Sequence, residues 1–198
     1  MKLLGITGPT GAGKSLLCQE LSKHIPVIDA DEVYHSLLIP PSECLNALRH
    51  AFGDTVFLHD GTLDRTALAT VVFSDEEKLA LLNQTVLDFV LQKIRSMIAD
   101  FEQAGALAVA VDAPTLIESG FHKECDAVLS VLASPEVRLS RIIARDAISE
   151  EKAALRIAAQ KDDDFYRAHS DVVLVNDGDA DALISHAAEF LATLGIEL

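Results

Sequence analysis

Eight consecutive residues near the N-terminus, Gly8 to Ser15, have types and a spacing suited to holding phosphate groups. They read Gly-Pro-Thr-Gly-Ala-Gly-Lys-Ser, which is the P-loop pattern G-x-x-x-x-G-K-[ST]. The glycines allow backbone N–H groups to turn toward phosphate oxygens, and Lys14 is expected to reach the β- and γ-phosphates. Ser15 is expected to place its hydroxyl on Mg²⁺, which prefers oxygen ligands. The pattern predicts nucleotide contacts from Gly8, Gly11, Ala12, Gly13, Lys14, Ser15 and Leu16.

The flanks of this loop supply the context that a P-loop requires. The apolar run from Leu3 to Ile6 predicts a strand before the loop, and the segment from Leu16 to Leu21 predicts a helix after it. The N-terminus of that helix adds its dipole and its free amides to the phosphate site. The alternative is an ordinary glycine-rich turn between a strand and a helix, which the match on both flanks disfavours.

Carboxylates follow two other apolar runs. Asp29 and Asp31 come after Ile25 to Ile28, and Asp112 ends the strand predicted for Ala106 to Val111. In a doubly wound sheet the carboxyl ends of the strands meet at the ligand edge, so these groups are expected beside the P-loop. Asp31 is then a candidate base, with the N-cap of the next helix as its alternative role. Asp112 resembles a Walker B carboxylate, which orders Mg²⁺ through water.

Three arginines share one face of a predicted helix that begins at Ser134-Pro135. Arg138, Arg141 and Arg145 fall at positions i, i+3 and i+7. In so acidic a chain they predict a lid that folds onto ATP and neutralises charge in the transition state. The alternative is a solvated face paired with acidic neighbours, Glu136, Asp146 and Glu150.

Composition limits the classes of function. The 198 residues are 49% hydrophobic and carry a formal charge of −15, which fits one α/β domain and argues against a nucleic-acid-binding surface. The apolar runs are too short for a membrane span, and the chain enters the P-loop strand without a cleavable signal, so a cytoplasmic protein is expected. Three scattered cysteines argue against a zinc site.

The remaining segments complete an α/β pattern. Apolar runs at Ala127 to Leu132 and Val172 to Val175 predict a fourth and a fifth strand, and Asn176, just after the last one, is expected near the adenine. Ser74 to Glu77 forms a capping box for a long helix that ends near Gly105. The acidic run Asp162 to Asp164 is interpreted as a solvated turn. Arg65 is either an anion contact or a solvated arginine.

Taken together, the ordered motifs resemble those of the dephospho-coenzyme A kinase family, which phosphorylates the ribose 3′-hydroxyl of dephospho-CoA in the last step of CoA synthesis. The resemblance runs nearly end to end and is most specific in Val27-Ile28-Asp29-Ala30-Asp31 and in Asp112-Ala113-Pro114 with Leu116, Glu118, Ser119 and Gly120. It implies a P-loop NTPase fold with a five-stranded parallel sheet flanked by helices. A helical acceptor-binding insertion (about 36–104) and a lid (about 135–167) would interrupt a core of about 1–35, 105–134 and 168–198.

The resemblance also implies roles for individual residues. Asp31 would accept the hydroxyl proton, while Lys14, Ser15 and Mg²⁺ would organise ATP. Arg65 would hold the acceptor together with Glu118, and Arg141 and Arg145 would meet the ATP phosphates. A monomer or weak homo-oligomer is expected, with ATP and dephospho-CoA as its partners and without nucleic acid or membrane.

Two departures from the family bear on acceptor binding. Leu87-Asp88 stands where relatives often have His-Pro, and Tyr166 stands where a lysine or arginine is usual. Leu16 also replaces a common threonine, a change that the loop tolerates because Ser15 remains. Two other functions stay open: a P-loop kinase for another small acceptor such as a nucleoside monophosphate, and an ATP-binding sensor without turnover.

Overall fold

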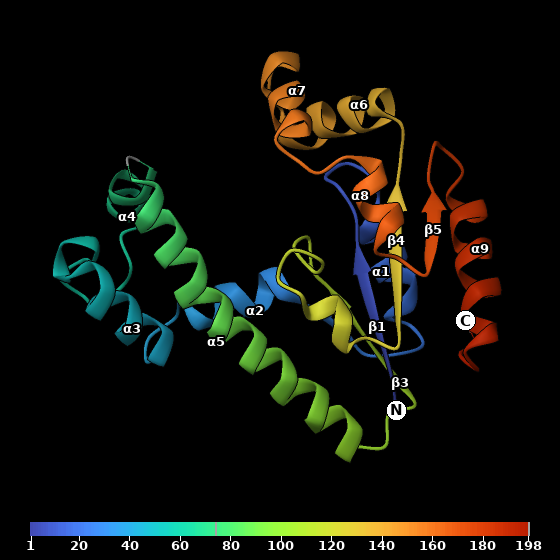
Figure 1. The fold of residues 1–198 in the computed structure, drawn as a ribbon, viewed down its shortest axis with the longest axis horizontal. Coiled ribbons are helices and arrows are strands. Elements are labelled where there is room, and N and C mark those ends of the chain that lie inside the picture. Colours follow the sequence, from blue (N-terminus) through green and yellow to red (C-terminus); the bar gives the residue numbers. More distant parts are fainter. Residues whose placement is uncertain (74, 198) are drawn as a thin grey trace. The chain divides into compact units, whose positions relative to one another are not determined.

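A parallel sheet of five strands carries the P-loop at the carboxyl end of its central strand (Figure 1). The computed structural model describes residues 1–73 and 75–197. The strands lie in the order β2-β3-β1-β4-β5, and β1 pairs in parallel with both β3 and β4. Their bounds are β1 Lys2–Thr7, β2 Val27–Asp29, β3 Ala108–Asp112, β4 Ala127–Leu132 and β5 Val172–Val175. The predicted five-stranded parallel sheet is confirmed.

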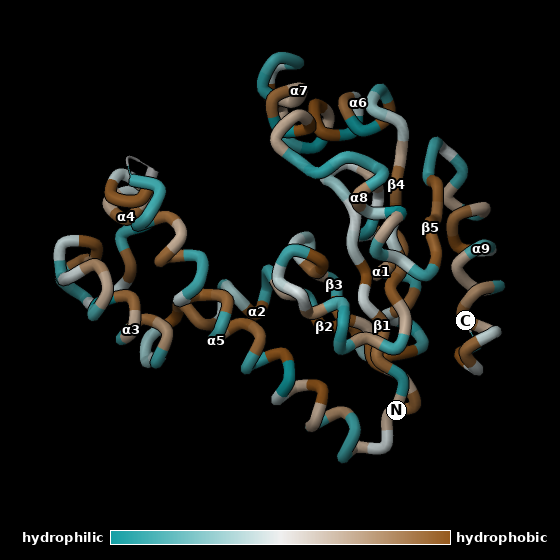
Figure 2. Tube along the Cα trace, viewed as in Figure 1, coloured by the Kyte–Doolittle hydropathy of each residue, from teal (hydrophilic) through white to brown (hydrophobic). Residues whose placement is uncertain are grey.

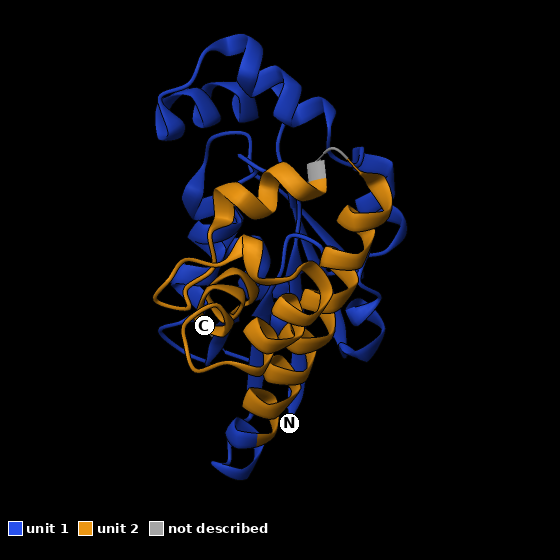
Figure 3. Ribbon diagram, turned by 90° about the vertical axis from the view of Figure 1, so that its left-hand side faces the viewer, with its two compact units in different colours: residues 1–28, 100–198 blue, residues 29–99 orange. Residues whose placement is uncertain are grey.

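The chain divides into two compact units, coloured separately in Figure 3. The first unit consists of residues 1–28 and 100–198, and the second of residues 29–99. The first contains the P-loop and the helices predicted as a lid, and the second contains Asp31 and Arg65. The predicted boundaries of the insertion and of the lid remain predictions.

Both faces of the sheet are covered within the first unit. Successive side chains of a strand point to opposite faces, so Val131 and Leu132 enter different cores. Val131 packs in the core that includes helices α1 (Lys14–Leu21) and α9 (Ala180–Thr193), whereas Leu132 packs with Tyr166 of helix α8 (Asp163–Ala168). This two-sided burial explains why every residue of β4 is buried and why all of them except Ser130 are apolar. Figure 2 shows the same hydrophobic character along β5.

The helices of the first unit are α1 Lys14–Leu21, η2 Phe121–Glu124, α6 Pro135–Asp146, α7 Glu150–Ala158, α8 Asp163–Ala168 and α9 Ala180–Thr193. Helices α1 and α6 lie where the sequence predicts helices, whereas no helix was predicted at η2 or at α8. Proline occupies the first position of α6, as the sequence predicts, and the Ser149 side chain caps α7 by accepting a hydrogen bond from the N–H of Lys152.

The interpretation of Asp162 to Asp164 as a turn was wrong, although Asp162 and Asp164 are exposed as expected. Asp162 caps helix α8 by accepting a hydrogen bond from the N–H of Phe165 at 2.9 Å, and Asp163 and Asp164 form its first turn. Carboxylates stabilise this end of a helix because the free N–H groups and the helix dipole favour negative charge there.

The second unit is helical. Its elements are α2 Ala30–Leu37, α3 Glu43–Phe52, η1 Asp54–Val56, α4 Arg65–Phe73 and the first part of α5 Glu76–Gln103. One small core joins Leu48 of α3 to Leu82 and Val86 of α5. The predicted cap at Ser74 lies outside the described residues. Asp75, next to it, accepts hydrogen bonds from the N–H groups of Glu77 and Lys78.

Candidate active site

The P-loop follows β1 and wraps around the start of α1 with backbone angles that its glycines permit. Gly8 has φ of 137°, and a Cβ atom there would lie 2.2 Å from the carbonyl oxygen of Val131. Gly13 has φ of 101° and forms the N-cap of α1. Lys14 Nζ donates a hydrogen bond to the carbonyl oxygen of Gly8 at 3.3 Å, which holds the ammonium group across the loop. The loop therefore presents a cation together with a helix N-terminus.

Arg141 of α6 and Asn176, which follows β5, donate hydrogen bonds to backbone carbonyl groups of the loop. Arg141 Nη1 donates to the carbonyl oxygens of Gly11 (3.3 Å), Ala12 (3.3 Å) and Asn176 (3.0 Å). The buried Asn176 side chain donates to the Ala12 carbonyl at 2.8 Å and accepts a bond from Arg141 Nη2 at 3.3 Å. Both residues fix the loop backbone, and direct contacts of either with ATP remain a prediction.

The other two arginines of the predicted lid face differ from each other. Arg145 is exposed and pairs with Asp146, whose carboxylate raises the pKa of Arg145. Arg138 is only 4% exposed and bonds the carbonyl oxygen of Thr10, and burial lowers its pKa. The arginines therefore do not form one uniform face toward ATP, because the first of them lies beneath the loop.

A pocket of about 270 Å³ lies between the P-loop and α6. Lys14 and Ser15 line it from the loop, and Arg141 and Arg145 line it from α6. Three cations around one small cavity, in a chain with a formal charge of −15, favour a polyanion such as the phosphate chain of a nucleotide.

Asp112 lies beside the strand that leads into the P-loop. It ends β3 and pairs in register with Ile6, two residues before Gly8. Its Oδ2 accepts a hydrogen bond from the Cys18 thiol of α1 at 3.3 Å. Within the described part of the chain no cluster of three or more His, Cys, Asp or Glu side chains could hold a metal ion.

Within the second unit, Asp29 rather than Asp31 caps helix α2. The Asp29 carboxylate accepts hydrogen bonds from the N–H groups of Asp31 (2.8 Å) and Glu32 (3.1 Å). The alternative role of Asp31 as the N-cap was therefore wrong, since the strand ends at Asp29 and that residue takes the cap position. Asp31 itself is exposed in the first turn of α2.

His35 is a residue that sequence reasoning missed. It follows Asp31 by four positions, so both side chains lie on one face of α2. Its Nδ1 lies 3.3 Å from Nη2 of Arg65, which begins α4. The second unit thus brings an exposed carboxylate, an imidazole and a guanidinium near one another. The i, i+4 spacing from Asp31 was the sequence signal for His35.

Comparison with known proteins adds the family. The family model described as dephospho-CoA kinase matches residues 2–182. The chain belongs to the dephospho-CoA kinase family. A dephospho-CoA kinase from Shouchella clausii is 36% identical over 176 residues, which covers 88% of this chain and 89% of the relative.

Two solved structures are similar to this chain over nearly its whole length. The crystal structure of TT1252 from Thermus thermophilus has a TM-score of 0.80 at 32% identity and covers 98% of this chain and 97% of its own. Dephospho-CoA kinase from Campylobacter jejuni has a TM-score of 0.71 at 22% identity, with 98% of both chains covered, and shows the shared fold. The predicted family, its P-loop kinase fold and its class as a kinase are confirmed.

Tyr166, one of the two departures from the dephospho-CoA kinase pattern, is a core residue in this kinase. It is 2% exposed and packs with Ile117 and Leu132. Burial, followed by the nearby negative charge of Glu118, raises its pKa to about 12. Glu118 itself is exposed. Tyr166 is therefore part of the core, and the acceptor role of Glu118 remains a prediction.

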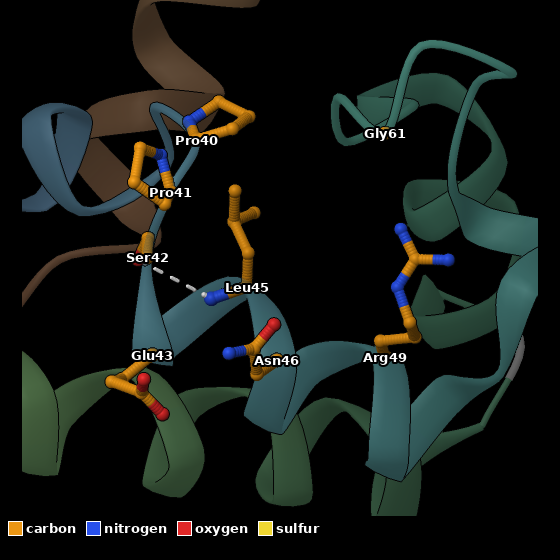
Figure 4. A pocket seen from close by; sticks show the side chains of 8 residues that line it. All are labelled: Pro40, Pro41, Ser42, Glu43, Leu45, Asn46, Arg49 and Gly61. Carbon is orange, nitrogen blue, oxygen red and sulfur yellow. Dashed lines mark hydrogen bonds between the residues drawn. The ribbon is translucent and has the colours of Figure 1, made fainter.

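Asp88, the other departure from the dephospho-CoA kinase pattern, is exposed on α5 and lines a shallow groove with Leu81 and Phe89. A separate pocket of about 340 Å³ lies between the start of α3 and the loop at Gly61 (Figure 4). Arg49 of α3 lines this pocket, pairs with Asp54 and stacks over a phenylalanine ring. The lining of this pocket contains the carboxylate of Glu43 as well as the cation of Arg49, so it lacks the excess of positive charge found in the pocket beside the P-loop.

Proposed function

We propose that this kinase transfers the γ-phosphoryl group of ATP to the ribose 3′-hydroxyl of dephospho-CoA, giving CoA and ADP. The observation that carries the proposal is the cation-lined pocket between the P-loop and α6. Membership in the dephospho-CoA kinase family supports the acceptor.

Each residue of the site has a separate role in the proposed phosphoryl transfer. Asp31 takes the proton from the 3′-hydroxyl while that oxygen forms its bond to the γ-phosphorus, and the bond between this phosphorus and the bridging oxygen breaks to release ADP. Lys14 and Arg141 stabilise negative charge on the transferred group, and Arg145 holds the outer phosphates. Arg65 and Glu118 bind the acceptor, with His35 positioning the Arg65 guanidinium.

Mg²⁺ fits the donor set beside the loop. Ser15 offers a hydroxyl in the pocket, and Asp112 offers a carboxylate at the end of the neighbouring strand. Such hard oxygen donors, with phosphate oxygens and water, suit this ion. When bound, Mg²⁺ supplies charge neutralisation on the β- and γ-phosphates, with Asp112 acting through water.

We further propose that the protein works in the cytoplasm as a monomer or weak homo-oligomer, without nucleic acid. Among the described residues, no helix is both long and apolar enough to cross a membrane.

The proposal is tested by a comparison of acceptors. Purified protein is given ATP and Mg²⁺ with dephospho-CoA or with each nucleoside monophosphate, and ADP release and product mass are followed. Turnover with dephospho-CoA and a product that carries a 3′-phosphate are expected. Turnover only with a nucleoside monophosphate would show that this compound, and not dephospho-CoA, is the acceptor. ATP binding without turnover would show that the protein is an ATP sensor and not an enzyme.

A further inference from the structure

Thr10, inside the P-loop, is bonded through three of its polar atoms to the segment that contains α6 and α7. Its N–H donates to Gln160 Oε1 at 3.1 Å, and its carbonyl oxygen accepts a bond from Arg138 Nε at 3.0 Å. Its hydroxyl accepts a bond from Arg145 Nη2 at 3.3 Å. Arg138 Nη2 also donates to Gln160 Oε1 at 2.8 Å. Thr10, Arg138 and Gln160 thus form a closed ring of hydrogen bonds, which we name the Thr10 clamp.

The burial of Arg138 shows that this arrangement is costly to build. A guanidinium that is 4% exposed has lost most of its hydration, and only good hydrogen bonds offset that loss. An apolar side chain could fill the same space without a desolvation cost. Packing alone therefore does not explain an arginine at this position.

The backbone of α6 also lies directly against the loop. A Cβ atom at Gly11, where φ is 78°, would come within 2.9 Å of the carbonyl oxygen of Arg138. The missing side chain of Gly11 thus lets α6 approach closely enough for the Arg138 side chain to reach Thr10. The P-loop and α6 therefore contact each other both through their backbones, at Gly11 and Arg138, and through the Arg138 side chain.

We infer that Arg138 and Gln160 are positioning residues that hold the P-loop in its ATP-binding conformation through the Thr10 clamp. A P-loop binds phosphate through backbone amides that must point toward the ligand. If the loop had to be ordered during binding, the loss of conformational entropy would lower the affinity for ATP. The clamp fixes the peptide groups on both sides of Thr10, directly before Gly11 to Ser15. It also ties both ends of the α6–α7 segment to the loop, since Arg138 lies in α6 and Gln160 follows α7.

This inference rests on the proposed use of ATP. The test uses Arg138→Met, Gln160→Met and the double variant in the full-length protein, with Arg156→Met as the matched control. Arg156 is an exposed arginine of α7 that pairs with Asp146. The measurements are the dissociation constants for ATP and ADP, the KM for dephospho-CoA, and the hydrogen exchange rate of the Thr10 amide in the nucleotide-free protein.

Each single variant is expected to raise the dissociation constant for ATP about tenfold, the loss that goes with one hydrogen bond to a charged group. The KM for dephospho-CoA and the Arg156→Met control stay unchanged, and Thr10 exchanges about tenfold faster. The dissociation constant of the double variant for ATP is expected to equal that of the weaker-binding single variant, because either substitution alone already opens the ring of hydrogen bonds.

The proposed role of the Thr10 clamp would be overturned if ATP affinity were unchanged in the variants. It would also be overturned if the two substitutions caused independent losses of ATP binding free energy that add up in the double variant. If Arg138→Met fails to fold, Arg138→Lys replaces it. A lysine keeps the charge but lacks the two-pronged geometry, so ATP affinity is again expected to fall. If wild-type protein binds ATP but does not phosphorylate dephospho-CoA, the proposed function fails, whereas the affinity and exchange measurements still decide the clamp.

Discussion

Substitution of Asn176 by alanine tests how the site is held together. The Asn176 side chain donates to the Ala12 carbonyl at 2.8 Å and accepts from the Arg141 guanidinium at 3.3 Å, and the residue is 3% exposed. A neutral buried hydrogen bond contributes about 1 kcal/mol and one to a charged group about 1.5–3 kcal/mol. Asn176→Ala is therefore expected to lower the free energy of unfolding by about 2.5–4 kcal/mol, which for a chain of this size is roughly 5–15 °C in Tm.

The assay combines denaturation with calorimetric binding of ATP and of inorganic tripolyphosphate. Because Asn176 acts on the loop, the variant is expected to weaken both ligands by the same factor. Asn83→Ala, an exposed asparagine of α5, is the control and is expected to change stability by less than about 0.5 kcal/mol. Unchanged stability with a loss confined to ATP would refute the argument, since it would place Asn176 against the adenine instead.

Three further predictions concern the loop, the core and the metal. Gly13→Ala abolishes ATP binding, as measured by calorimetry, because its Cβ would lie 2.1 Å from Asn176 Nδ2 at a φ of 101°; retained affinity would contradict this. Burial raises the pKa of Tyr166 and Cys125 to about 12, so the folded state favours their protonated forms and the free energy of unfolding falls between about pH 9 and 12. Tyr166→Phe reduces that fall by about 1–3 kcal/mol in denaturant titrations, and an unchanged slope would refute the assignment. Asp112→Asn raises the Mg²⁺ concentration for half-maximal rate about tenfold while metal-free ATP binding stays constant, and an unchanged Mg²⁺ requirement would exclude the metal role.

The sequence was most informative where local pattern decides structure. The run before Gly8 is apolar because β1 is buried in the middle of the sheet, and the loop pattern requires strand and helix on either side. Ser42 and Ser149 could be recognised as helix caps because the cap is formed within three residues. These features depend on neighbours along the chain, so a single sequence contains the necessary signal.

The sequence was less informative where side chains meet across the fold. Helical spacing placed Arg138 with Arg141 and Arg145, yet spacing alone does not tell which of them lies beneath the P-loop. The contact of Arg138 with Thr10 depends on how α6 docks, which local pattern does not encode. His35 was likewise missed, because its partner Arg65 lies thirty residues away.

The proposed phosphoryl transfer depends most directly on Asp31 as the base. The decisive measurement compares kcat for phosphorylation of dephospho-CoA by the wild-type protein and by Asp31→Asn, together with the dissociation constant for ATP. A fall in kcat of about 10²–10⁴-fold with unchanged ATP affinity is predicted, since the amide cannot accept the hydroxyl proton. A variant that retains its kcat would contradict the role of Asp31 and with it the proposed mechanism.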